Sequence, residues 1–427
     1  MKRAENMFDL VIENGICFIS GDFIERNIGI INNKIAYVGK ESIKGKEKIN
    51  ARGCLVLPGF FNAHTHSAMT ILRGYAEGLP LDKWLDKVWK IEAMLDERSI
   101  YIASMLACIE MLKNGITCFS DMYIHMDSVA RAVEETGIRA VLGYGMADRG
   151  SKDRMEKELK IALDFIKNCE NKERIKPMLT PHAIYTCSPE FLSRINDLAN
   201  EMGLIKHIHA SETLWEVKES KKKFGRSPIK LLDDIKFLDE KTVLAHCIWL
   251  SGDEINLIAN RRTSVVHCPS SNLKLSSGIA KIAEMAENGV NVAIGTDGAA
   301  SNNMLNIFSE IRLSALLQQL RKKFLSPVKY LEMATKNGYR AYGIDGGEIE
   351  KGKIADIIVV EPKIYQMPIY NYANSLVFSS NGCEVRDVIV NGKIVLEDRV
   401  PINVDDEKVV DQISKLKEKI LKKLNYL

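Results

Sequence analysis

The chain has 427 residues, of which 46% are hydrophobic and 27% charged, a composition typical of a soluble globular protein with a substantial core. Its formal net charge is only +3, and the basic residues are spread along the chain, which argues against a nucleic-acid partner or a membrane-surface partner. Residues 1–25 contain no long apolar core and no apolar run approaches about 18 residues, so neither a signal peptide nor a membrane span is expected.

The cysteine pattern predicts the compartment. Nine cysteines occur at irregular spacing and without a Cys-x-x-Cys pair. An odd, irregular set does not suggest a disulfide framework or a zinc knuckle. We therefore expect reduced thiols in a cytoplasmic protein.

Both ends of the chain read as short strands joined by tight turns. Residues 8–57 contain the hairpin signals Asn14-Gly15 and Asn32-Asn33. A strand pattern at 354–360 and a hairpin pattern at 388–395 occur near the other end of the chain. We expect one small β-sandwich domain built from residues 1–57 and 351–427. The basic C-terminal segment carries apolar residues at helical spacing, which predicts a surface helix docked by one stripe.

The middle of the chain alternates between two patterns. Helical periodicity, as at 98–114, separates apolar β-like runs at 54–60, 116–121, 139–146, 176–181, 204–210, 242–247, 263–267 and 291–296. Eight such repeats predict an α/β fold, a (β/α)8 TIM-type barrel over residues 58–350. The competing open doubly wound sheet usually has a Gly-x-Gly-x-x-Gly turn after its first strand, which is absent here.

Polar side chains gather where the predicted strands end. His64 and His66 follow the first strand, and residues i and i+2 of an extended chain point to the same side. Later strands end in His182, in His207 and His209 followed by Glu212, in His246, in His267 and in Asp297. The His-x-His pair alone also fits an accidental surface pair. In a barrel, however, all these ends meet on the face where active sites are built.

This set of donors predicts a metal site. A catalytic zinc takes nitrogen and oxygen ligands and keeps one position open; we choose His64, His66, His209 and Asp297. His207 is a rival on the same strand face, which we place deeper in the barrel wall. The fourth strand ends in Thr180-Pro181-His182, with no lysine or carboxylate to bridge two ions, so one divalent ion is expected. Zinc is the default, and iron, manganese or nickel suit the same ligand types.

Several motifs resemble the amidohydrolase superfamily. They are Pro-Gly-Phe-Phe-Asn-Ala-His-Thr-His at 58–66, His-Ala-Ser-Glu-Thr at 209–213, Leu-Ala-His-Cys at 244–247, Ser-Asn-Leu-Lys-Leu at 271–275 and Gly-Thr-Asp-Gly-Ala-Ala-Ser-Asn-Asn at 295–303. The resemblance covers essentially the whole chain and is strongest to deaminases of 5′-deoxyadenosine, methylthioadenosine and S-adenosylhomocysteine. It implies a cytoplasmic hydrolase that deaminates an adenosine-type nucleoside to the inosine analogue plus ammonia, in salvage of S-adenosylmethionine by-products.

The resemblance also implies roles for individual residues. Glu212 would be the proton shuttle facing purine N1, His246 would polarise the reacting centre, and Asp297 would take the water proton and pass it to ammonia. The substrate-binding residues would be Trp84, Glu92, Tyr144, Arg154, His182, Glu212 and Ser301, with residues 84–92 as a mobile lid. Tyr144 stands where some members have an arginine for a carboxylate-bearing tail, which tilts the expectation toward small or neutral 5′ groups.

Structural readings compete with several of these roles. Trp84 is also explained by packing, Glu92 by a solvated helix face, Arg154 by a surface ion pair and Tyr144 by lining of the barrel mouth. The rival enzyme reading keeps the site and changes the substrate to guanine, cytosine or a triazine. The non-catalytic alternative is a scaffold protein on the same fold, which the intact ligand set disfavours. The sequence leaves a homo-oligomer open.

Overall fold

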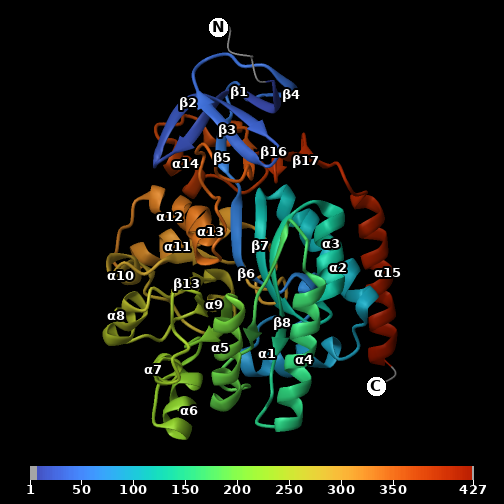
Figure 1. Cartoon of the computed structure of the whole chain (residues 1–427), viewed down its shortest axis with the longest axis vertical. Helices are drawn as coiled ribbons and strands as arrows, with labels where there is room; N and C mark the ends of the chain where they lie inside the picture. The colour runs from blue at the N-terminus through green and yellow to red at the C-terminus, as the bar shows by residue number, and fades with distance from the viewer. Residues whose placement is uncertain (1–6, 426–427) are drawn as a thin grey trace.

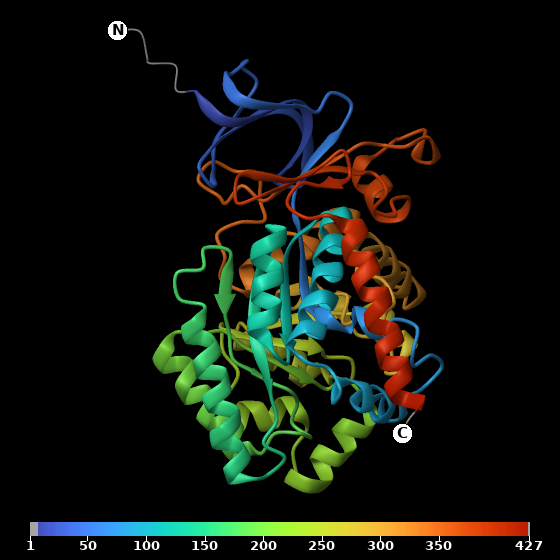
Figure 2. The same cartoon turned by 90° about the vertical axis from the view of Figure 1, so that its right-hand side faces the viewer.

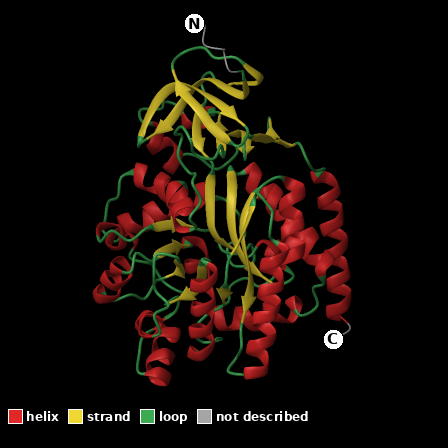
Figure 3. Cartoon of the chain, viewed as in Figure 1, coloured by secondary structure: helices red, strands yellow, loops and turns green. Residues whose placement is uncertain are grey.

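The computed structural model describes residues 7–425 as a sheet region stacked on a helix-wrapped barrel (Figure 1). Helices enclose the barrel strands, and most of the remaining strands lie in the upper sheet (Figure 3). Within the described range, no helix combines the length and the apolar character needed to cross a membrane.

Eight parallel strand positions form the barrel. They are β6 (Phe60–Thr65), β7 (Ile116–Tyr123), β8 (Arg139–Met146), β9 (Ile175–Pro177) with β10 (Thr180–Pro181), β11 (Lys206–Ala210), β12 (Thr242–His246), β13 (Ser264–His267) and β14 (Val292–Ile294). Bridges at Leu179–Lys206 and Ala183–His209 join the two arcs of strands on one side. On the other side, the Asp297 N–H donates to the His64 carbonyl at 2.9 Å. The predicted TIM-type barrel is therefore confirmed.

Helices cover the outside of the barrel and sit in its loops. They are α1 (Leu81–Glu92), α2 (Glu97–Lys113), α3 (Met126–Thr136), α4 (Lys152–Asn168), α5 (Pro189–Met202), α6 (Leu214–Phe224), α7 (Pro228–Asp234), α8 (Gly252–Asn260), α9 (Pro269–Lys274), α10 (Ile282–Glu287), α11 (Ile307–Leu320), α12 (Pro327–Ala334) and α13 (Lys336–Ala341). Local chemistry starts several of them: the side chains of Ser151, Ser188 and Thr213 cap α4, α5 and α6 by accepting a backbone N–H three residues on. A short 3-10 helix, η1 (Ser67–Leu72), and α1 occupy the loop after β6.

One nine-stranded sheet unites the two ends of the chain. Its order is β18-β17-β16-β15-β5-β1-β2-β3, with β4 paired to β1. The N-terminal strands are β1 (Phe8–Ile19), β2 (Asp22–Ile31), β3 (Lys34–Gly39), β4 (Gly45–Asn50) and β5 (Leu55–Pro58); the C-terminal strands are β15 (Ile357–Val360), β16 (Val385–Val390), β17 (Lys393–Glu397) and β18 (Val400–Pro401). β5 and β15 pair antiparallel and so join the two ends directly. Figure 2 shows the blue N-terminal strands curling above the red-orange C-terminal strands.

The C-terminal part also contains η2 (Ile364–Gln366), α14 (Tyr372–Phe378) and α15 (Asp406–Asn425). α15 packs along α2 beside the barrel (Figure 2), and its Leu416 and Ile420 are buried there. The predicted surface helix docked by an apolar stripe is confirmed.

The apolar run expected as a single strand at 54–60 is divided at Gly59. β5 belongs to the sheet and β6 to the barrel, so the turn at Gly59 separates the two regions. A Cβ on Gly59 would lie 2.0 Å from Thr117 Oγ1, and Thr117 is itself fully buried with its hydroxyl 2.9 Å from Tyr339 Oη. Only glycine lets the backbone at residue 59 approach Thr117 this closely, next to the strand that carries His64.

We expect Gly59→Ala to lower the free energy of unfolding by about 1–3 kcal/mol, because the added methyl overpacks a filled site. The denaturation midpoint followed by circular dichroism measures it. Gly252→Ala is the matched control, since a Cβ there meets no atom within 4 Å. Equal stability of the two variants would contradict the assigned role of Gly59.

Candidate active site

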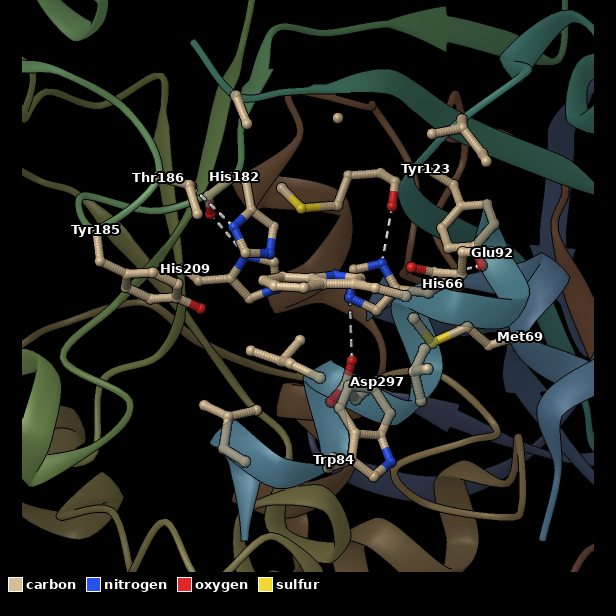
Figure 4. A pocket seen from close by; sticks show the side chains of 18 of the residues that line it. His66, Met69, Trp84, Glu92, Tyr123, His182, Tyr185, Thr186, His209 and Asp297 are labelled. Carbon is tan, nitrogen blue, oxygen red and sulfur yellow. Dashed lines mark hydrogen bonds and ion pairs between the residues drawn. The ribbon is translucent and has the colours of Figure 1, made fainter. Parts of the chain in front are cut away.

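A cavity of about 320 Å³ opens at the carboxyl ends of the barrel strands. Its floor includes His66, His209 and Asp297, and its walls come from α1 and from the loops after β7, β8 and β10. Figure 4 shows these side chains pointing into one space, with Asp297 joined to His66 by an ion pair. The volume lies within the range of small-molecule sites.

Three imidazoles and one carboxylate converge on the floor. Candidate ligand atoms of His64, His66 and His209 all lie within 4.8 Å of one another. Asp297 Oδ1 is 3.5 Å from His64 Nε2 and 3.2 Å from His66 Nε2. The three imidazoles therefore form one cluster, and the Asp297 carboxylate lies beside His64 and His66.

Backbone carbonyls orient two of the rings. His66 Nδ1 donates to the Met122 carbonyl at 2.7 Å, and His209 Nδ1 donates to the His182 carbonyl at 2.7 Å. A proton held on Nδ1 leaves Nε2 as a lone pair. Both rings are thus set in the tautomer that a metal ligand requires.

The Asp297 carboxylate is held by two hydroxyls. Ser271 donates to Oδ2 at 2.5 Å and Ser301 donates to the same oxygen at 2.8 Å. Oδ1 therefore remains directed at the imidazoles. Ser301 is fully buried under the carboxylate.

The electrostatics of the floor favour a bound cation. Burial tends to raise the pKa of Asp297, but interaction with His64 and His66 outweighs it and keeps that pKa well below its usual range. Burial lowers the pKa of His64 to about 4, whereas Asp297 overcomes burial at His66 and raises its pKa to about 9. His64 Nε2 makes no hydrogen bond to any described residue although it is buried. An anionic carboxylate beside an unsatisfied ring nitrogen matches the donor set of a divalent metal.

Glu212 and His246 stand beside this cluster. His246 Nε2 lies 3.9 Å from Glu212 Oε2, and its Nδ1 donates to Asn272 Oδ1 at 2.8 Å. Ser277 donates to Glu212 Oε1 at 3.2 Å. Burial raises the pKa of Glu212, which favours its protonated form compared with an exposed glutamate.

A second glutamate fixes the loop that carries Glu212. Glu216 accepts the backbone N–H of Ser211 at 3.1 Å and that of Glu212 at 2.7 Å. Glu216 lies on the first turn of α6, whereas Glu212 precedes that helix. Glu212 is left free to face the cavity.

Four residues at or just after these strand ends have a left-handed backbone. Ser211, His246, Cys247 and Asp297 all have positive φ, between 48° and 71°. Each left-handed non-glycine residue costs on the order of 1–3 kcal/mol and persists only where the surroundings impose it. The barrel is thus holding these side chains in a particular direction.

α1 forms one wall of the cavity. Trp84 is almost fully buried, lines the cavity and donates from Nε1 to the Ala300 carbonyl at 3.3 Å. Glu92 is half-buried and accepts a hydrogen bond from the Tyr123 hydroxyl, seen beside it in Figure 4. Burial raises the pKa of Glu92. Glu92 thus faces the cavity and not open solvent.

His182 lines the opposite side. Its Nδ1 lies 3.0 Å from Thr186 Oγ1, and burial lowers its pKa to about 3. The ring is therefore neutral, and it can exchange hydrogen bonds with a ligand edge.

The outer wall contains the residues expected near the 5′ end of a nucleoside. Tyr144, Arg154 and Glu158 all line the cavity, and Arg154 Nη2 lies 3.6 Å from Glu158 Oε1. Burial, followed by the charge of Glu158, raises the pKa of Tyr144 to about 12. Arg149, which no motif singled out, also lines the cavity with its guanidinium 5.3 Å from the Trp89 ring centre.

Sequence reasoning missed several residues of the site: Tyr123, Arg149, Glu158, Tyr185, Glu216 and Asn272. Tyr123 ends β7 and Arg149 follows β8, so a rule that inspects every strand end, and not only histidines and acids, would have found both. Asn272 lies within a quoted motif but carried no assigned role.

Comparison with known proteins agrees with this geometry. Residues 55–395 match the amidohydrolase family. The chain is 55% identical to 5-methylthioadenosine/S-adenosylhomocysteine deaminase 2 of Archaeoglobus fulgidus over 95% of this chain and 97% of that protein. It is 42% identical to 5′-deoxyadenosine deaminase of Methanocaldococcus jannaschii, covering 94% and 97%.

Solved structures share the fold. An adenosine deaminase from Xanthomonas campestris with bound zinc superposes with a TM-score of 0.93 at 31% identity, covering 97% of this chain and 99% of that one. Atrazine chlorohydrolase from Arthrobacter aurescens, with zinc, superposes at 0.90 with 23% identity, covering 96% and 100%, which shows the fold alone. The chain belongs to the amidohydrolase family.

Proposed function

We propose that this protein is a metal-dependent hydrolase that deaminates an adenosine-type nucleoside to its inosine analogue and ammonia. The observation that carries the proposal is the placement of Glu212 and His246 beside the cluster of three imidazoles and Asp297, inside one enclosed cavity. The identity of the relatives as deaminases of 5′-deoxyadenosine and methylthioadenosine supports the same substrate class.

The proposed cofactor is one divalent ion held by His64, His66, His209 and Asp297, with zinc the first choice because zinc is bound in the similar adenosine deaminase structure. When bound, such an ion makes water acidic enough to supply hydroxide near pH 7. The oriented rings and the buried anionic carboxylate support this ligand set.

The proton transfers fall to two carboxyl groups. Glu212, whose pKa burial raises, delivers a proton to purine N1 as water attacks C6, which prevents full negative charge on the ring. Asp297 accepts the proton lost by that water and returns it to the departing ammonia, and the hydroxyl left on C6 gives its remaining proton to Glu212 as the C6 carbonyl forms. His246, oriented by Asn272, directs Nε2 at the developing oxygen and stabilises its charge in the imidazolium form, in which both ring nitrogens carry a proton.

The cavity walls supply substrate contacts. We assign Trp84 to cover the purine, His182 to its edge and Glu92 to the ribose hydroxyls. Tyr144 and Arg154 line the part of the cavity that we assign to the 5′ group of the nucleoside. Ser301 acts indirectly, through the hydrogen bond that it donates to Asp297. Because Glu158 already pairs Arg154, a small or neutral 5′ group suits this end better than a carboxylate.

Domain limits and setting are also proposals. We assign residues 1–57 and 351–427, with the terminal helix, to a β-sandwich domain and residues 58–350 to the catalytic barrel. The division of strands at Gly59 supports the first limit. A cytoplasmic location accords with nine free cysteines.

Purified protein loaded with zinc is expected to convert 5′-deoxyadenosine, methylthioadenosine, adenosine or S-adenosylhomocysteine, with ammonia released and the adenine absorbance replaced by that of hypoxanthine. Steady-state rates on these four nucleosides, alongside guanine, cytosine and a chlorotriazine, give the measurement. Turnover of only the bases or the triazine would replace the nucleoside assignment with the rival reading.

Glu212→Gln is expected to lower kcat on the best nucleoside by about 10²- to 10⁴-fold, the usual worth of a positioned acid–base group. Glutamine keeps the volume and the contact with Ser277 but cannot carry the proton. Metal content by atomic emission should stay equal to wild type. Glu156→Gln, on the exposed face of α4, is the control with unchanged kcat. An active Glu212→Gln variant would refute the role.

Glu158→Gln is expected to raise kcat/KM for S-adenosylhomocysteine relative to 5′-deoxyadenosine by about fivefold. The substitution removes the negative charge of Glu158, whose repulsion of the substrate carboxylate is worth about 1 kcal/mol in a solvated site. It also frees Arg154 to pair with that carboxylate. Competition between the two substrates in one reaction measures the ratio directly. An unchanged ratio would mean that Glu158 does not read the 5′ group.

A further inference from the structure

A chain of hydrogen bonds runs from His64 into the barrel core. His64 Nδ1 lies 2.8 Å from His207 Nε2, and His207 Nδ1 lies 2.8 Å from the Tyr342 hydroxyl oxygen. That hydroxyl lies 2.6 Å from the Ala63 carbonyl oxygen. The chain therefore returns to the residue that precedes His64.

The direction of every proton in this chain is determined. The Ala63 carbonyl can only accept, so it takes the single proton of the Tyr342 hydroxyl. The hydroxyl oxygen then accepts from His207 Nδ1, and a neutral His207 is left with a lone pair on Nε2. His64 must donate from Nδ1 to that lone pair, which leaves His64 Nε2 unprotonated and facing Asp297.

His64 differs from the other two rings in how it is oriented. His66 and His209 each donate directly to a backbone carbonyl. A neutral imidazole such as His207 has one nitrogen that donates and one that accepts, and its tautomer decides which is which. His207 therefore fixes the tautomer of His64 only while Tyr342 fixes the tautomer of His207. His207 and Tyr342 are both fully buried, so water does not replace either partner.

We propose that His207 and Tyr342 are positioning residues that fix the tautomer of His64 and thereby raise the affinity of the site for its metal ion. The inference rests on the proposed metal ligand set and not on the identity of the substrate. His207 is thus neither a ligand nor a passive part of the core. Tyr342, on the turn after α13, belongs to the site because it orients His207.

The test measures binding of zinc alone to metal-stripped full-length protein, by competition with a chromophoric chelator. His207→Phe keeps an aromatic ring but removes the acceptor for His64, and we expect zinc affinity to fall about 10- to 100-fold. His207→Gln returns an acceptor at the position of Nε2, so we expect partial recovery. Tyr342→Phe removes one hydroxyl and should weaken zinc binding by a smaller factor.

Tyr339→Phe provides the matched control. Tyr339 and Tyr342 pack on the same ring, that of Phe61, and both hydroxyls are buried and hydrogen-bonded. The Tyr339 hydroxyl, however, contacts Thr117 and Asp356, whereas the Tyr342 hydroxyl contacts His207. A merely structural role would lower the unfolding temperature of metal-free protein in both variants and leave zinc affinity unmoved.

The expected pattern is weakened zinc binding in His207→Phe and Tyr342→Phe, recovery in His207→Gln and unchanged binding in Tyr339→Phe. Wild-type zinc affinity in folded Tyr342→Phe and His207→Phe would overturn the inference. Equal affinity loss in Tyr339→Phe and Tyr342→Phe would overturn it as well. Since no nucleoside is present, failure here is distinguishable from failure of the proposed reaction.

Discussion

The structure of the site depends on one buried carboxylate that requires a positive partner. Asp297 sits on the floor of the cavity, anionic and almost fully buried, with two hydroxyls on one oxygen and imidazoles beside the other. An isolated buried charge is costly, so the arrangement is stable only with a cation nearby. Without a metal, a proton on His66 serves, as its raised pKa indicates. The proposed divalent ion would satisfy the same need and would use one nitrogen of each of the three rings.

The fold makes this arrangement by bringing distant segments to one face. The Asp297 N–H bonded to the His64 carbonyl closes the barrel, so the contact that completes the sheet also brings the first and last ligands together. The left-handed backbone at His246 and Asp297 then turns their side chains toward the cavity. Stability contributed by the barrel core offsets this local strain.

The amino-acid sequence predicts the parts that follow from periodicity and position. Seven of the eight apolar runs match barrel strands, and three of the histidines at strand ends, His64, His66 and His209, form one cluster. The division of the first run at Gly59 was not predicted, because it depends on the close approach of Thr117 on the neighbouring strand β7.

Contacts between residues that are distant in the sequence were not predicted either, because they too depend on the folded arrangement. Glu216 reads as a helix-start acid until its two backbone partners are seen, and Tyr342 lies 135 residues from the histidine that it orients. The charge pairing of Arg154 is similar, because its partner Glu158, one helical turn on, was not singled out from the sequence. Sequence therefore predicts which side chains stand at the strand ends better than the contacts that those side chains make.

The most direct test of the central claim is a crystal structure of zinc-loaded protein with anomalous scattering recorded at the zinc edge. One anomalous peak is predicted, about 2.0–2.2 Å from Nε2 of His64, His66 and His209 and from a carboxylate oxygen of Asp297. Two peaks in the cavity, or a single peak that contacts His207 in place of these four side chains, would contradict it.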